Sequence, residues 1–462
     1  MLFRERENPA LGYQTAIKKF KVEKRKREGS MERTDSRYQA YMNILKEELI
    51  PAMGCTEPIA LAYGAAVARQ ELGVLPDRVT VGVSGSILKN VKSVIVPNTG
   101  HMKGIAAAVA AGIVAGEAEK ELEVLSQVSE EQIQAIKAYM DSTEIRVEHI
   151  DNGLMFEILI TMYKGEDWSR VRIVNYHTNV VLIEKNGMVK KEVKVEGETE
   201  KGLTDRSCLS MEGIWDFIHT ADLEDLKKAL KLQASCNMAI AKEGMTHSYG
   251  ANVGKSLASC VEGQKADSDT DIAILARAMA AAGSDARMDG CELPVVINSG
   301  SGNQGITVSV PVLVYAEHLR AGEEKTYRAL ALSNLTAIYQ KTPIGRLSAF
   351  CGAVSAGAGA GAGIAYLKGG DFEAVCRTVS NTLAVTPGMI CDGAKPSCAG
   401  KIAMAVEAGI MGCRMNSDGE KFLSGDGIIG EDADETISNT GRVAREGMRA
   451  TNDTIIKIMI GD

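Results

Sequence analysis

The chain has 462 residues, enough for two or three domains, because a single hydrophobic core rarely grows beyond about 250–300 residues. Its formal net charge of −8 argues against a surface for nucleic acid or acidic membranes, since neutralising phosphates requires a dense basic face. We therefore expect a small-molecule partner, with no nucleic acid and no membrane.

The apolar segments of the chain are short. The longest run of small apolar residues, GIAAAVAAGIVAG at 104–116, falls below the about 20 residues of a membrane span, and no apolar leader opens the sequence. We expect a cytoplasmic protein. Ten cysteines in that compartment are expected to be buried thiols, metal ligands or catalytic groups rather than disulfides.

The first half of the chain shows mixed helical and strand patterns. Residues 1–35 lack periodicity, so we expect a disordered tail or an extension preceding a true start at Met31. Apolar residues at helical spacing predict a helix over 36–50, and a second helix follows Pro58 after the loop PAMGCTEP. Further along, the pattern predicts a strand at 78–88, a glycine-containing turn at 97–104, a helix at 104–116 and alternating strands within 144–163 and 170–198.

The pattern becomes mainly helical after about residue 200. The charged stretch EGETEKG at 196–202 indicates a boundary between a mixed α/β domain at 36–200 and a helical domain at 201–462. The run AVSAGAGAGAGIAYL at 353–367 has so many small residues that we expect helices to pack there backbone to backbone. The predicted fold class is α+β, with an Ala/Gly-rich helical second domain.

Two stretches resemble nucleotide or cofactor motifs only in part. GANVGKS at 250–256 has Tyr249 where the first glycine of a phosphate-binding loop belongs, and no apolar strand precedes it. SGSGNQG at 299–305 is similar to the loop of pyridoxal-phosphate dehydratases, yet no Schiff-base lysine motif lies upstream. We therefore expect neither nucleotide hydrolysis nor pyridoxal phosphate.

The loop INSGSGNQG nevertheless suits a carboxylate. It follows the short strand LPVVI and precedes a long apolar run, so its backbone N–H groups would lie at the start of a helix. An ordinary tight turn is the alternative. The candidate contacts are the backbone amides of 299–305 and the side chains of Ser299, Ser301, Asn303 and Gln304.

Three cysteines stand beside small residues that would let a bulky inorganic group approach the backbone. These are Cys351 in SAFCGAV, Cys391 in MICDG and Cys398 in PSCAG. Thiolates are the usual ligands of iron–sulfur clusters. Spacing alone leaves three buried thiols or a zinc site as alternatives.

These segments resemble the iron–sulfur-dependent serine dehydratases. AFCGAVSAGAGAG and MICDGAKPSC are similar to that family's two cysteine segments, although Gly393 stands where the family has proline. MGCTEPIAL, GSILKNVKSVIVPNTGHMKG and VVINSGSGNQG resemble further family segments in the same order, so the resemblance covers roughly 36–415.

One departure within this resemblance concerns the substrate loop. MGCTEP replaces the Ser-Ser-His of the serine dehydratases and resembles the L-cysteine desulfidase branch. The resemblance implies a 4Fe-4S cluster held by Cys351, Cys391 and Cys398, and conversion of L-cysteine to pyruvate, ammonia and sulfide without pyridoxal phosphate. Cys55, Thr56 and Glu57 would then lie in the substrate loop.

The residues permit a β-elimination in which one open iron acts as a Lewis acid on the leaving group. Cys55 is a candidate for the base that removes the Cα proton, or for a fourth iron ligand displaced by substrate. His101 and Lys103 are secondary candidates for the base or for carboxylate binding. A homodimer is expected on general grounds.

Three other interpretations remain open. An iron–sulfur L-serine dehydratase would use the same cluster with a hydroxide leaving group. A non-catalytic iron–sulfur redox sensor would hold a cluster without turning over substrate. The cysteines could instead be structural, in a pyridoxal-phosphate or metal-free enzyme.

Overall fold

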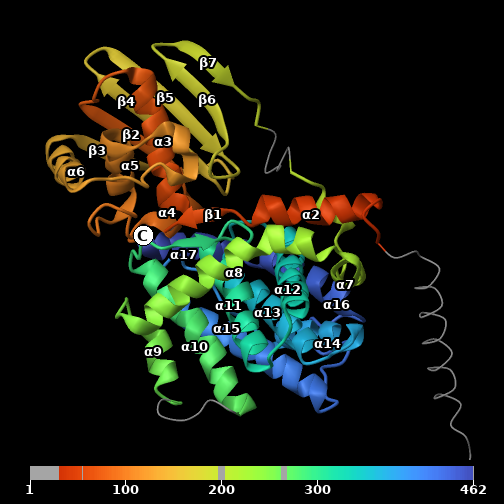
Figure 1. Cartoon of the computed structure of the whole chain (residues 1–462). Coiled ribbons are helices and arrows are strands. Elements are labelled where there is room, and N and C mark those ends of the chain that lie inside the picture. The colour runs from red at the N-terminus through yellow and green to blue at the C-terminus, as the bar shows by residue number, and fades with distance from the viewer. Residues whose placement is uncertain (1–30, 55, 196–202, 262–267, 461–462) are drawn as a thin grey trace, which may run out of the picture.

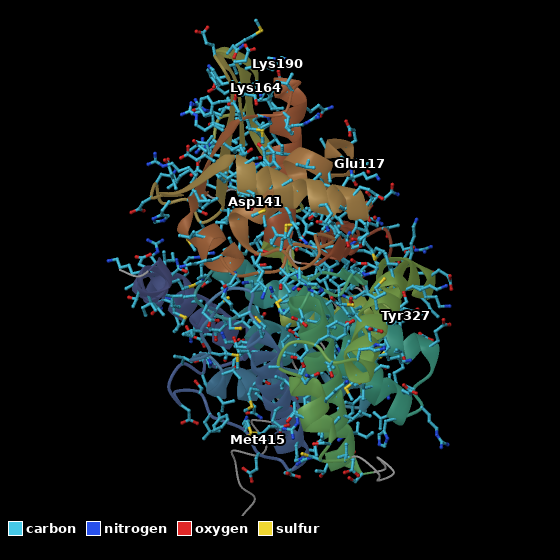
Figure 2. All side chains as sticks on the ribbon, turned by 90° about the vertical axis from the view of Figure 1, so that its left-hand side faces the viewer. Glu117, Asp141, Lys164, Lys190, Tyr327 and Met415 are labelled. Atoms are coloured by element: carbon cyan, nitrogen blue, oxygen red, sulfur yellow. The ribbon has the colours of Figure 1, made fainter. Side chains whose placement is uncertain are left out.

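A computed structural model describes residues 31–54, 56–195, 203–261 and 268–460, which form an α/β part resting on a larger helical body (Figure 1). The view turned by 90° places Lys164 and Lys190 on the α/β part and Tyr327 and Met415 on the helical body (Figure 2). The predicted α+β class is therefore confirmed. Among these residues no helix is long and apolar enough to cross a bilayer.

A six-stranded sheet organises the α/β part, with the strand order β3-β2-β4-β5-β6-β7. Only β2 and β3 run parallel, and every other neighbouring pair is antiparallel. The strands are β2 (Arg78–Ser84), β3 (Glu144–Ile150), β4 (Glu157–Lys164), β5 (Asp167–Val174), β6 (Val180–Lys185) and β7 (Met188–Glu192). The helices of this part are α3 (Thr56–Leu72), α4 (Gly85–Val91), α5 (Gly104–Ala115) and α6 (Glu130–Ser142), with a 3₁₀ turn η1 (Ala118–Glu123).

The core of the α/β part lies between the sheet and its helices. Val79, Val81 and Val83 alternate along β2 toward this core and are fully buried, as the period of a strand with one buried face requires. The predicted strand at 78–88 ends at Ser84, because Gly85 opens the short helix α4. The fully buried Ile87 and Val91 of α4 extend the same core.

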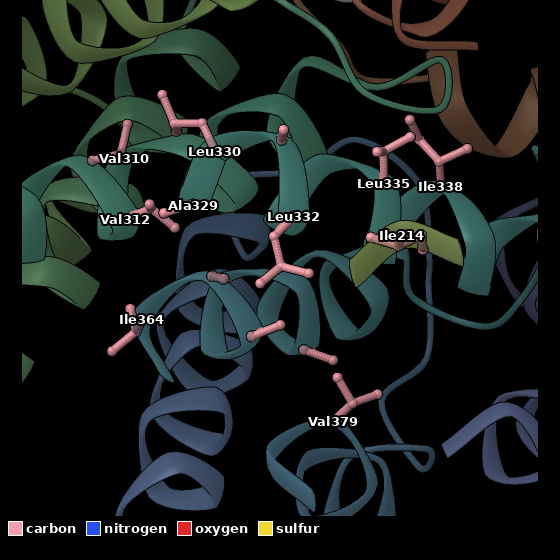
Figure 3. Packing of buried hydrophobic residues seen from close by; sticks show 14 of the residues in the cluster. Ile214, Val310, Val312, Ala329, Leu330, Leu332, Leu335, Ile338, Ile364 and Val379 are labelled. Atoms are coloured by element: carbon pink, nitrogen blue, oxygen red, sulfur yellow. The ribbon is translucent and has the colours of Figure 1, made fainter. Parts of the chain in front are cut away.

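The helical body is built around α13 (Gly352–Leu367). Its other helices are α7 (Met211–Thr220), α8 (Leu223–Thr246), α9 (Val253–Ala258), α10 (Asp269–Met288), α11 (Gly302–His318), α12 (Glu323–Ile344), α14 (Phe372–Val385), α15 (Cys398–Ser417) and α16 (Ala433–Arg442). Short η2 (Arg206–Cys208) and η3 (Val443–Gly447) segments complete it. Leu332 of α12, Ile364 of α13 and Val379 of α14 belong to one buried cluster (Figure 3).

Small residues let α13 and α15 approach closely, as the alanine- and glycine-rich pattern predicts. A Cβ atom added to Gly357 would lie 2.4 Å from the Ala405 carbonyl oxygen, and one added to Gly361 would lie 2.8 Å from the Gly409 carbonyl oxygen. Neither position can accept a larger side chain without backbone movement. This contact fixes the N-termini of α13 and α15 relative to each other.

Three connections tie the α/β part to the helical body. Helix α2 (Ser36–Glu48), expected in the first domain, contributes Tyr38, Tyr41 and Leu45 to the core of the helical body, and Met31 is buried with them. Strand β1 (Pro51–Met53) pairs with β8 (Pro294–Val296), and α17 (Arg449–Ile460) packs against α4. The expected boundary stretch 196–202 lies outside the described residues.

Candidate active site

The segments that carry Cys351 and Cys391 are joined by a short antiparallel bridge. The Cys351 N–H donates to the Met389 carbonyl at 3.1 Å, and the Cys391 N–H donates to the Ala349 carbonyl at 2.7 Å. Cys398 follows within the same loop and opens α15. Two segments about forty residues apart in sequence thus hold three cysteines together.

Two helix N-termini point toward these cysteines. Cys351 is the N-cap residue of α13, and its backbone lies in the extended region. Cys398 is the first residue of α15. Because a helix N-terminus carries a partial positive charge, each helix dipole would stabilise negative charge on the sulfur beside it.

The loop between Cys391 and Cys398 is shaped by Gly393. Gly393 has a positive φ of 94°, and a Cβ atom there would lie 2.4 Å from the Lys89 carbonyl oxygen. Position 393, where the serine dehydratases have proline, therefore requires glycine, because the loop passes close to the backbone of α4 there. The Cys398 Sγ accepts a hydrogen bond from the Lys395 N–H at 3.5 Å, which closes the loop.

The three thiols influence one another. Burial and, to a smaller extent, the nearby Cys391 and Cys398 together raise the pKa of Cys351 to about 12. Burial also raises the pKa of Cys398. The bare thiols of Cys351 and Cys398 would stay protonated at neutral pH, whereas a metal group that binds thiolate would displace their protons.

A cluster and a single ion require different arrangements of these thiols. Among the residues that the structure describes, no three His, Cys, Asp or Glu side chains meet closely enough to hold one metal ion. A single ion needs every sulfur about 2.3 Å from one point, whereas an iron–sulfur cluster takes its thiolates on separate irons. Three cysteines around one cavity, with small neighbours and two helix N-termini, fit such a cluster.

The cysteines open onto a cavity of about 110 Å³ between the α/β part and the helical body. Nine residues proposed from the sequence line it: Cys351, Cys391, Cys398, Thr56, Glu57, Ser299, Ser301, Asn303 and Gln304. The folded chain thus brings the cysteine segments, the start of α3 and the 299–305 loop to one place.

The 299–305 loop forms the N-terminal approach to α11, as predicted. Ser301 is the N-cap residue of α11 and accepts a hydrogen bond from the Gln304 N–H. Ser299 has a positive φ of 50°, an uncommon conformation for a residue with a side chain, and its Oγ donates to Asn298 Oδ1 at 2.9 Å. Backbone strain of this kind is often found where a loop binds a ligand.

Gln304 links this loop to the cysteines. A Cβ atom added to Gly352, the residue after Cys351, would lie only 2.6 Å from Gln304 Cδ, so the amide packs directly against the start of α13. Gln304 Oε1 is buried and has no hydrogen-bond partner among the described residues. A buried acceptor without a partner costs about 1–3 kcal/mol, which a bound ligand could offset.

The cavity lining carries more positive than negative charge. Five of its residues are cationic: Lys89, Lys341, Lys401, Arg287 and Arg346. The lining contains one acid, Glu57. Its Oε1 accepts a hydrogen bond from Asn90 Nδ2 at 2.9 Å, and its Oε2 accepts one from Thr56 Oγ1 at 3.1 Å. Arg346 and Lys401 pair with Glu48 and Asp392 outside the lining, so Arg287, Lys89 and Lys341 carry the positive charge that favours an anionic ligand.

Arg287 connects the two polar loops. Its Nη2 donates to the Gly54 carbonyl at 2.8 Å and its Nη1 donates to Asn303 Oδ1 at 3.2 Å. The side chain is buried, and its Nε has no hydrogen-bond partner among the described residues. A buried guanidinium beside the 299–305 loop is a natural partner for a carboxylate.

Two lysines lie buried beside the cysteines. Lys89 donates to Asn452 Oδ1 at 2.9 Å and to the Cys391 carbonyl at 3.2 Å. Burial lowers the pKa of Lys341 to about 8, whereas Cys391 and Cys351 raise it. Two buried ammonium groups require nearby negative charge, which thiolates holding a cluster would provide.

The serine dehydratase alpha chain family matches this chain over residues 119–457. The chain belongs to that family. The matched segment includes Arg287, the 299–305 loop and all three cysteines, and the family is of the lyase type. Thr56, Glu57 and Lys89 lie before its start.

Relatives of the chain cover almost its full length. A UPF0597 protein of Desulfitobacterium hafniense is 52% identical over 433 residues, covering 93% of this chain and 98% of the relative. A UPF0597 protein of Treponema denticola is 44% identical over 428 residues, covering 92% of this chain and 99% of the relative. One from Vibrio campbellii is 38% identical over 427 residues, again covering 92% and 99%. This serine dehydratase alpha chain member therefore has relatives that match both its parts.

The remaining sequence candidates lie elsewhere. Cys55 is outside the described residues. His101 and Lys103 are exposed in the turn before α5 and do not line the cavity. The turn is closed by a hydrogen bond from the Val96 N–H to the Met102 carbonyl.

The cavity-lining residues of this family member that were not proposed from the sequence include four that bear on its chemistry. They are Lys89, His177, Arg287 and Lys341. Only Lys89 could have been recognised from the sequence, because this charged residue interrupts the apolar run of GSILKNV between Leu88 and Val91. The other three lie in segments whose burial depends on distant parts of the chain.

Proposed function

We propose that the chain catalyses β-elimination of L-cysteine to pyruvate, ammonia and hydrogen sulfide, with an iron–sulfur cluster and without pyridoxal phosphate. The observation that carries this proposal is the cavity itself. Three cysteines, a carboxylate-suited loop and an excess of positive charge meet there, in a chain of the serine dehydratase alpha chain family.

Cys351, Cys391 and Cys398 would hold the cluster. With three protein ligands, one iron would remain open and would supply Lewis-acid chemistry to the leaving group when the cluster is bound. Lys89 and Lys341 would balance the negative charge of the thiolates. The N-termini of α13 and α15 would contribute to the same balance.

The polar side of the cavity would hold the amino acid. Its carboxylate would rest on the backbone amides of 299–305, near the Arg287 guanidinium. Asn303 and Gln304 would provide further polar contacts. This placement would direct the side-chain sulfur of the substrate toward the cysteines. The Cα–H bond would then lie between the 299–305 loop and the cysteines.

The reaction balances without an oxidant or reductant. A base takes the Cα proton, the electron pair of that bond forms the Cα=Cβ bond, and the Cβ–S bond breaks with its electron pair leaving on sulfur. The released 2-aminoacrylate tautomerises to an imine, and water hydrolyses the imine to pyruvate and ammonia. The protein must supply the base, the carboxylate site and a position for the leaving sulfur.

Dehydration of L-serine is the second candidate, and the family match favours it. The same cavity would serve a hydroxide leaving group. The loop MGCTEP, which replaces the Ser-Ser-His of serine dehydratases, supports cysteine instead.

Parallel assays with the two amino acids separate these functions. We expect protein purified anaerobically and reconstituted with iron and sulfide to form pyruvate at least about 10-fold faster from L-cysteine than from L-serine, since one contact commonly distinguishes substrates by 10- to 200-fold. Faster turnover of L-serine would assign the chain to the dehydratases. A bound cluster with no turnover of either would favour a redox sensor, and absence of bound iron would favour structural cysteines.

A further inference from the structure

Besides the three cysteines and the two arginines, five titratable groups line the cavity, and four of them are committed to other contacts. Both oxygens of Glu57 accept hydrogen bonds, and Lys89 donates to three acceptors. Lys401 is paired with Asp392, which raises the pKa of the lysine. Lys341 donates to the Arg346 carbonyl at 3.4 Å. His177 is the fifth group.

His177 is held rigidly at the cavity wall. It lies in the connection from β5 to β6, whose ends are joined by a hydrogen bond from the Val174 N–H to the Asn179 carbonyl at 3.2 Å. The ring packs edge-on against Phe156, with 5.0 Å between centroids. Of the six histidines in the chain, His177 is the one that lines this cavity.

The imidazole is also available for proton transfer. Its Nε2 is buried and has no hydrogen-bond partner among the described residues. A Cβ atom added to Gly300 would lie 3.8 Å from His177 Cε1 and 3.3 Å from Arg346 Nη1, so the ring stands next to the carboxylate-suited loop. A substrate bound on that loop would therefore have His177 beside its Cα.

Burial keeps the ring neutral, and the two charges that face it act in opposite directions. Burial lowers the pKa of His177 to about 4, while the Glu57 carboxylate raises it and the Arg346 guanidinium lowers it. At neutral pH the imidazole thus has a free electron pair. A substrate carboxylate placed nearby would favour the protonated ring and raise its basicity when it is needed.

We infer that His177 is the catalytic base that removes the Cα proton of the amino acid substrate. The inference rests on the proposed function and adds the residue that accepts the proton. The proton moves from Cα to a ring nitrogen of His177 as the leaving group departs, and it returns to solvent after the product has left. The base thus comes from the α/β part and the cysteines from the helical body, so both parts are needed for the reaction.

The test compares His177→Gln with His149→Gln, which alters an exposed histidine on β3 of the same part. For His177→Gln we expect a fall in kcat of about 100- to 10,000-fold, with the KM for L-cysteine changed less than about 3-fold and the iron content unchanged. The control should keep wild-type kcat. Retention of more than a third of wild-type kcat by His177→Gln would overturn the inference while leaving the proposed function intact.

A second readout is independent of turnover. The reconstituted protein is labelled with ¹³C at histidine Cε1, and the His177 signal is identified by its absence in His177→Gln. We expect this signal to show a neutral ring at pH 7 and to shift when L-cysteine, or the slower substrate L-serine, is added. A charged ring at pH 7, or a signal unmoved by both amino acids, would overturn the assignment. Wild-type protein that forms no pyruvate from either amino acid would overturn the proposed function separately.

Discussion

Replacement of Cys391 by serine is expected to abolish cluster binding and catalysis together. Cys391 is fixed by the hydrogen bond from its N–H to the Ala349 carbonyl, directly across from the segment that carries Cys351. Mutation of a residue that only hydrogen-bonds a metal ligand lowers metal affinity or activity by about 10- to 100-fold. Loss of a ligand itself should therefore lower sulfide release by more than about 100-fold. Iron per chain, visible absorbance and sulfide release are measured after the same anaerobic reconstitution.

The matched control for this variant is Cys236→Ser. Cys236 is a half-buried thiol on α8, and it does not line the cavity. Wild-type iron content is expected for Cys236→Ser, and the same loss as for Cys391→Ser is expected for Cys351→Ser and Cys398→Ser. If Cys391→Ser kept wild-type iron and wild-type turnover, the three cysteines would be structural.

Replacement of Gly393 by alanine should disrupt the site without removing any polar group. Its φ of 94° disfavours a side chain, and the added Cβ would lie 2.4 Å from the Lys89 carbonyl oxygen. A residue forced into such a conformation costs about 1–3 kcal/mol. We expect a fall of that size in the free energy of unfolding, measured by denaturant titration, and about 10-fold less bound iron after reconstitution as the loop between Cys391 and Cys398 shifts.

Gly388→Ala provides the comparison within the same segment. Gly388 is exposed, and a Cβ atom there would meet nothing within 4 Å. Its free energy of unfolding should stay within about 0.5 kcal/mol of wild type, with unchanged iron. Equal behaviour of the two alanine variants would mean that the backbone contact between Gly393 and Lys89 does not shape the cysteine loop.

Local patterns in the sequence were sufficient for most of the fold. Alternation of apolar residues predicts the strands of the sheet, and small residues predict the close contact of α13 with α15. The placement of α2 could not be predicted, because the stripe of Tyr38, Tyr41 and Leu45 indicates a buried face without indicating its partner. Helix α4 was missed since Ile87 and Leu88 continue the apolar character of β2 past Ser84.

The candidate site was predictable where its residues form short motifs. The cysteine segments, the start of α3 and the 299–305 loop were all proposed from the sequence, and the folded chain brings them to one cavity. His177 and Arg287 could not be proposed, because their burial arises from packing between segments more than a hundred residues apart. His101 and Lys103 had the right chemistry, but the closed turn that carries them exposes both.

The central claim is that this cavity carries out β-elimination, and product stoichiometry tests it most directly. Anaerobically reconstituted protein is given L-cysteine, and pyruvate, ammonia and sulfide are quantified in the same reaction over time. The account predicts the three products in equal amounts, with none formed by Cys391→Ser. Formation of alanine with protein-bound sulfur, or no pyruvate from either L-cysteine or L-serine, would contradict it.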